Sequence, residues 1–155
     1  MMSRLFGRGG RNTPAPAAAA PVVAEPFASR AMQQMDALSV ASRRAGRDLE
    51  PATYSYLRHL EDILRPAIED AVQHPILPER EHAIETMLTD LIPNTIAAFL
   101  RISDEDRAPG SPAAASLATQ LRMLGESATE IAALIKQDAV SALQANAYLL
   151  QSRLQ

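Results

Sequence analysis

Apolar positions recur with the period of an α-helix through most of the chain. Large apolar side chains are spaced three and four residues apart, as on one face of a helix, and no stretch sustains the two-residue alternation of a strand. Breaks rich in proline and glycine separate the periodic stretches. The pattern predicts an all-α protein, an antiparallel bundle of three to four helices at about residues 27–47, 51–73, 79–102 and 112–154.

Prolines lie inside the second and third predicted helices. Pro66 and Pro93 each lack a backbone N–H and crowd the preceding turn, so we expect a bend at each. On the second helix, Glu61 lies at the border of the apolar side, next to Leu60. It is also four residues from Arg65, and such pairs support an exposed helical face. The pattern leaves both positions for Glu61 open.

The last predicted helix is much longer than the others. At about 1.5 Å per residue it spans roughly 60 Å, against roughly 35 Å for each of its two predecessors. Its apolar positions step by four and three up to Ile135, and then Ala139, Leu143 and Ala147 step by four. Either the helix breaks near Gly125, or one end extends past its neighbours to meet the first helix or another chain.

Two polar residues lie near the apolar stripe of this long helix. There are two interpretations of Asp138 and Asn146. Either they are a polar pair that fixes the register or the choice of partner, or both lie at the border of the stripe. The change of spacing in this region leaves the direction of both side chains open.

The N-terminal residues 1–25 differ from the rest of the chain. They are basic and rich in proline and alanine, a composition that predicts a disordered tail. Leu5 and Phe6 lie among arginines, so this segment is either a docking peptide for an acidic groove or an anionic membrane surface, or an ordinary loose terminus. Prolines interrupt the alanine-rich run that a secretory leader would need, and we expect a cytoplasmic protein.

Charge and composition limit the function further. Residues 1–48 hold seven arginines and three acidic residues, a net charge of +4, which leaves −7 for residues 49–155. An acidic body argues against nucleic acid as the partner. The chain has no Cys, which excludes disulfides and thiolate metal sites. It has only three His, which leaves little room for histidine-rich chemistry. Because 29 residues are alanine, the hydrophobic fraction of 47% supplies only one modest core.

Candidate chemistry is sparse. Glu79 and His82 form the Glu-x-x-His half-motif of di-iron bundles, with Glu81 between them, but such a site needs a second copy and further glutamates. We therefore expect Glu79, Glu81 and His82 on a solvated first helical turn, and we expect no metal. No serine has an evident base and acid around it, and no glycine-rich loop fits a phosphate, so no catalytic residue or cofactor is predicted.

One segment resembles a known family. Residues 89–100, Thr-Asp-Leu-Ile-Pro-Asn-Thr-Ile-Ala-Ala-Phe-Leu, are similar to the Tyr-Leu-Pro-x-Thr-Leu-x-x-x-x-Tyr segment of bacterial XpaC-type proteins. Leu91 and Phe99 stand at aromatic positions of that segment. The resemblance extends to a preceding helix and a long following helix, over about residues 50–155. That family is named for 5-bromo-4-chloroindolyl phosphate hydrolysis and is grouped with tellurite and toxic-anion resistance; no catalytic residue is implied.

The sequence thus favours a non-enzymatic adaptor, linked by the resemblance to toxic-anion stress or to envelope processes. It would engage a protein partner or itself through the last helix, at Leu143, Leu150 and Leu154, and through Leu5 and Phe6 of the arm. Two alternatives stay open. One is a phosphate-ester hydrolase or anion-handling protein of the XpaC type, and the other is a peripheral membrane protein that docks through the basic arm.

Overall fold

The computed structural model describes residues 24–154, and within this range the chain forms helices and no strand. This confirms the predicted all-α class with a long C-terminal helix. The arm residues Leu5 and Phe6 lie outside the described residues. The helical segments are α1 (Phe27–Ala45), α2 (Pro51–Gln73), α3 (Pro78–Thr86), the π-helical turn η1 (Met87–Leu91), α4 (Ile92–Leu100) and α5 (Pro112–Arg153).

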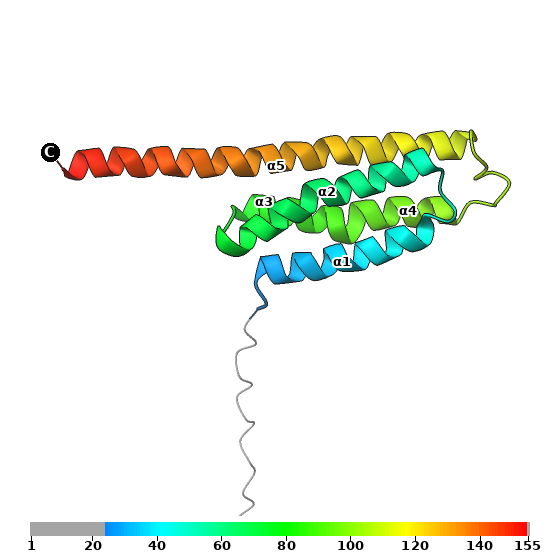
Figure 1. Cartoon of the computed structure of the whole chain (residues 1–155), viewed down its shortest axis with the longest axis horizontal. Helices are drawn as coiled ribbons and strands as arrows, with labels where there is room; N and C mark the ends of the chain where they lie inside the picture. The colour runs from blue at the N-terminus through cyan, green and yellow to red at the C-terminus, as the bar shows by residue number, and fades with distance from the viewer. Residues whose placement is uncertain (1–23, 155) are drawn as a thin grey trace, which may run out of the picture.

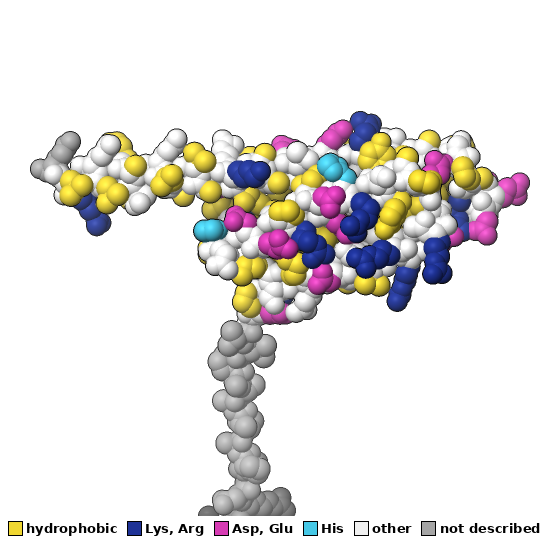
Figure 2. Space-filling view, viewed as in Figure 1, with side chains coloured by type: hydrophobic (Ala, Val, Ile, Leu, Met, Phe, Trp, Pro, Cys, Tyr) yellow, Lys and Arg dark blue, Asp and Glu magenta, His cyan; other side chains and the backbone are white. Residues whose placement is uncertain are grey.

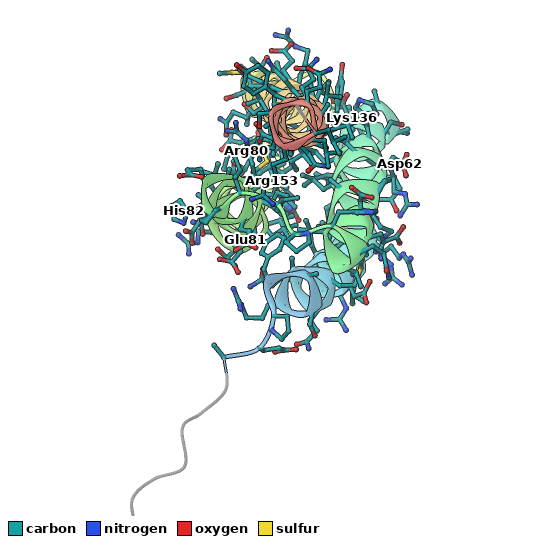
Figure 3. All side chains as sticks on the ribbon, turned by 90° about the vertical axis from the view of Figure 1, so that its left-hand side faces the viewer. Asp62, Arg80, Glu81, His82, Lys136 and Arg153 are labelled. Atoms are coloured by element: carbon teal, nitrogen blue, oxygen red, sulfur yellow. The ribbon has the colours of Figure 1, made fainter. Side chains whose placement is uncertain are left out.

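Four columns of helix make up the bundle: α1, α2, the α3–η1–α4 column and α5 (Figure 1). Viewed end-on, α1 and α5 occupy opposite corners, with α2 and the α3–α4 column at the other two (Figure 3). Columns that follow each other in the chain run in opposite directions, whereas the neighbours α2 and α5 run in the same direction (Figure 1). Because α2 and α5 start at the same end of the bundle, the longer α5 passes beyond the end of α2.

One hydrophobic core fills the space between the columns. Each buried Leu or Ile side chain contributes about 1.5–3 kcal/mol relative to leaving it in water. The core residues that are at most 3% exposed come from every column: Ala31, Met35, Leu57, Leu60, Leu64, Ile68, Ile84, Met87, Leu88, Ile92, Leu117, Leu121 and Ala128.

The two internal prolines have different local structures. Helix α2 continues through Pro66 from Pro51 to Gln73. Ahead of Pro93 the chain widens into the π-helical turn Met87–Leu91, where the Ile92 N–H donates to the Met87 carbonyl five residues back. A wider turn relieves the crowding between a proline ring and the carbonyl four residues earlier. The predicted single helix over residues 79–102 is therefore three segments that form one column.

Glu61 lies inside the bundle, which settles the position that the sequence left open, and it does not form an exposed pair with Arg65. Its side chain accepts hydrogen bonds from Ser39 Oγ of α1 at 2.8 Å and from Arg58 at 2.9 Å. Arg65 instead pairs with Asp36 of α1 at 3.0 Å. These polar contacts join α1 to α2 across an otherwise apolar interface.

Helix α5 is continuous from Pro112 to Arg153, so of the two alternatives that the sequence left open the structure has the extended end and no break near Gly125. Ser111 caps its start by accepting a hydrogen bond from the Ala114 N–H at 3.1 Å, and Pro112 occupies the first turn. The extended end does not pack on α1, which lies on the opposite side of the bundle (Figure 1). In residues 24–154 no helix has the length and apolar character that crossing a membrane requires.

Candidate interaction site

The C-terminal end of α5 projects from the bundle as a free helix (Figure 1). Ile135, which is 7% exposed, is the last buried residue, and every residue from Ala139 to Leu154 is exposed. We call residues 139–154 the overhang. At 1.5 Å per residue it is roughly 24 Å long.

The overhang is apolar and almost without charge. Its large apolar side chains lie in water; Leu143, for example, is 70% exposed and Tyr148 75%. Arg153 is its only charged residue. Figure 2 shows apolar groups along this projecting end, whereas charged groups cover much of the visible bundle surface. Soluble domains rarely expose large apolar patches, so this end of α5 is a candidate interaction site. The exposed large apolar residues of the overhang are Val140, Leu143, Tyr148, Leu149, Leu150 and Leu154.

These side chains are not a simple continuation of the face that packs on the bundle. The bundle-facing stripe of α5 runs through Leu117, Leu121, Ala128 and Ile135 and, kept at the same spacing, would continue at Asp138. A second stripe begins in the overhang, rotated by roughly a quarter turn about the helix axis. We call this set the outer stripe; its members are Val140, Leu143, Ala147, Leu150 and Leu154, which step by three, four, three and four.

The outer stripe lies on the α2 side of α5. Thr129, Lys136, Leu143 and Leu150 are seven residues apart and so share one face of the helix. Thr129 lines a cleft between α5 and α2 with His59. Figure 3 shows Lys136 on the same side. The outer stripe therefore starts where the end of α2 stops covering this face.

An ion pair holds the base of the overhang. Arg80 Nε of α3 donates to Asp138 Oδ2 of α5 at 2.9 Å, and both side chains are about three-quarters buried. Asp138 therefore has a partner within its own chain, at the border of the bundle-facing stripe. Asn146, the other polar residue considered above, lies exposed on the overhang.

The metal-ligand candidates do not form a site. Glu79, Glu81 and His82 lie at the start of α3, where Glu79 and His82 are exposed, and Figure 3 shows the side chains of Glu81 and His82 pointing in different directions. Within residues 24–154 there is no group of three His, Cys, Asp or Glu side chains that could hold a metal ion.

Sequence reasoning missed an open apolar groove between α1 and α4. It has a volume of about 720 Å³. Ala41 of α1 and Ala97 of α4 line it, and such small side chains leave space between the helices. Arg44 and Asp48 belong to its lining and provide its charged groups. The periodicity of each helix indicates its apolar face, but not the distance between two packed faces, so no local signal announces this groove.

The chain was compared with protein-family models, with curated proteins and with solved structures, and none of them matches it. The resemblance of residues 89–100 to XpaC-type proteins therefore stays a prediction. In the structure this segment spans the end of η1 and α4, where Ile92, Ile96 and Phe99 are buried core residues and Leu91 is exposed.

Proposed function

We propose that this chain is a non-enzymatic adaptor that displays the overhang of α5 as a binding surface for another helix. The observation that carries the proposal is the run of exposed residues from Ala139 to Leu154, apolar and nearly uncharged, on a helix that continues without a break from the bundle. A stable bundle has no need of these residues, because its core ends at Ile135.

The energetic basis is the apolar surface that a partner would cover. Burying one Leu or Val side chain contributes about 1.5–3 kcal/mol, and the outer stripe offers four such side chains. Association costs at least about 4 kcal/mol in lost translational and rotational freedom. The surplus is enough for binding, and an amphipathic helix that packs along the stripe is the mode of recognition that fits its spacing.

A phosphate-ester hydrolase or anion-handling protein of the XpaC type is the alternative that the resemblance suggests. Such chemistry needs convergent basic, acidic or metal-ligating groups around a bound anion. The groove between α1 and α4 has room for a ligand, and it offers Arg44 and Asp48 as charged groups. We favour the adaptor because a hydrolase or anion-handling function would not explain why the overhang exposes apolar side chains along a continuous helix.

The proposal is tested by affinity capture with the full-length chain as bait. The Leu143→Asp/Leu150→Asp variant places two charges on the outer stripe without touching the core. Met123→Asp is the matched control, because Met123 is 57% exposed on the bundle part of the same helix. We expect a partner, or a second copy of the chain, to be retained by the wild type and by Met123→Asp and lost from the double variant. Equal retention by all three would contradict the proposal.

A further inference from the structure

The outer stripe has the spacing of a coiled-coil seam. Its steps of three and four residues place Val140, Ala147 and Leu154 at one kind of seam position and Leu143 and Leu150 at the other. We propose that the partner of the overhang is the overhang of a second copy of this chain, packed antiparallel along the outer stripe. This inference rests on the proposed function, because it names the occupant of the same surface.

Two copies of the outer stripe are complementary in shape when they run antiparallel. In an antiparallel pair with the two-fold axis at the level of Ala145, Val140 lies opposite Leu150 of the second copy, and Leu143 lies opposite Ala147. Each layer thus combines a larger and a smaller side chain, so the separation of the two helices stays nearly constant along the seam. At the ends, Leu154 packs against the aliphatic stem of Lys136 of the second copy, whose ammonium group stays in water.

The residues beside the seam also match themselves. In the same register Asn146 and Gln144 each lie beside their own counterparts, and Gln137 lies beside Gln151 of the second copy. All are neutral amides that can donate and accept hydrogen bonds. Arg153 lies beside Ala139 of the second copy. A seam for a different partner is typically selected by charged flanking residues, and the overhang has only one charged residue, Arg153.

The orientation follows from the side of α5 on which the stripe lies. The outer stripe continues the line of Lys136 and Thr129, which is the α2 side of the helix. In a parallel pair the two bundles would lie at the same end and their α2 helices would collide. In an antiparallel pair the bundles would lie at opposite ends of the paired overhangs, and the tip of each overhang would end beside the bundle of the other chain.

A lipid surface fits the overhang less well. Helices that lie in a membrane interface combine an apolar face with a face rich in Lys and Arg that is attracted to anionic headgroups. The overhang has one cation, Arg153, at its tip, and the face opposite the outer stripe carries Ser141, Tyr148, Leu149 and Ser152 and no cation. Binding to vesicles is therefore an outcome that the experiment has to exclude.

The overhang is only roughly 24 Å long. A typical stable interface buries about 800 Å² on each partner, so one helix face of this length is a small interface. We therefore expect a dimer that dissociates on dilution through the micromolar range. Sedimentation velocity of the full-length chain over a concentration series measures this. We expect the wild type and Met123→Asp to shift from monomer to dimer together. We expect Leu143→Asp/Leu150→Asp to dissociate at least about a hundredfold more easily, since each carboxylate would replace a buried Leu in two layers.

Disulfide formation reports the orientation, and the chain has no cysteine of its own to interfere. In the antiparallel register Ala147→Cys alone should remain uncrosslinked under oxidation, whereas an equal mixture of Ala147→Cys and Leu143→Cys chains should form the mixed disulfide dimer. A parallel seam would instead crosslink Ala147→Cys with itself, and that result would overturn the register.

Circular dichroism of every variant excludes loss of folding as the cause of a change. A wild-type chain that stays monomeric at the highest concentration overturns the second-copy inference, while capture of another protein through the overhang would still uphold the proposed function. Flotation of a monomeric wild-type chain with anionic vesicles, lost in the double Asp variant, would overturn both in favour of a lipid surface. Dimer formation that survives the double Asp variant also overturns the inference.

Discussion

The two parts of α5 have similar composition and opposite surroundings. Residues 112–135 pack against α2 and the α3–α4 column and bury Leu117, Leu121 and Ile135. Residues 139–154 leave Leu143, Leu150 and every other residue exposed. Both parts belong to one unbroken helix. An apolar stripe at helical spacing thus indicates an amphipathic helix, but the spacing alone does not show whether another helix of the same chain covers that stripe.

A helix of the length of the overhang would be marginal on its own in water. Here the packed part of α5 supplies the nucleus, and the Ala-rich overhang extends it at little cost because alanine has the highest helix propensity. The Arg80–Asp138 ion pair joins the two parts at the point where the packing ends. The bundle therefore holds the overhang as a preformed helix, which would lower the entropic cost of binding the proposed partner.

The largest expected change in stability distinguishes the packed part of α5 from the overhang. Leu121→Ala should lower the free energy of unfolding by about 2–5 kcal/mol, because Leu121 is fully buried and the change leaves a cavity. Leu143→Ala should change it by less than about 0.5 kcal/mol, because Leu143 is mostly in water. Urea unfolding followed by circular dichroism at low protein concentration measures both. Similar losses for the two variants would show that the overhang is part of the fold.

The buried residue Glu61 tests whether removing a polar side chain from inside the bundle lowers the stability as removing an apolar one does. Glu61→Ala should lower the free energy of unfolding by about 1–3 kcal/mol, because the buried Ser39 hydroxyl loses its acceptor and the partly exposed Arg58 loses its ion-pair partner. Glu69→Ala, on the exposed side of the same helix, is the matched control and should change little. Equal values for the two would contradict the contacts described between α1 and α2.

Glycine 125 offers a stabilising change in the packed part. A Cβ atom at this position would meet only His59 Cδ2, at 3.9 Å, which is ordinary van der Waals contact. Gly125→Ala should therefore raise the free energy of unfolding by roughly 0.5–1 kcal/mol through helix propensity. Thermal and urea unfolding measure the gain, and a loss of stability would mean that α5 approaches α2 more closely than the structure has it.

The smallest expected loss of stability comes from the ion pair at the base of the overhang. Breaking the partly buried Arg80–Asp138 pair with Arg80→Ala should cost about 0.2–1 kcal/mol. A double-mutant cycle with Asp138→Ala isolates the interaction. Hydrogen exchange should become faster at the first amides of the overhang and stay unchanged near Leu121. Unchanged exchange at the overhang would show that the ion pair does not hold it.

Much of the fold could be predicted from the periodicity of apolar positions. The expected helix at 51–73 has the observed bounds, and the first was expected two residues too long. Pro93 predicted an interruption, but not that a π-helical turn would keep the column continuous, because that depends on neighbouring contacts. Glu61 could not be placed because its partner Ser39 is 22 residues away, on another helix.

The sequence marked Leu143, Leu150 and Leu154 as possible partner-binding residues. The structure leaves all three exposed, and their role in binding stays a prediction. Val140 was missed, although its three-residue step to Leu143 was a usable signal. The outer stripe as a separate face could not be recognised until the bundle-facing face of α5 was known, since periodicity alone does not show where one stripe stops being covered.

Site-specific photo-crosslinking from the overhang tests the central claim most directly. A photoreactive amino acid replaces Leu150 in the full-length chain, and a second protein carries it at Met123, which is similarly exposed on the packed part of α5. Illumination in cells should crosslink position 150 to another polypeptide, either a second copy or a different protein, with little product from position 123. Equal crosslinking from the two positions, or none from position 150, would contradict the account of the overhang as a binding surface.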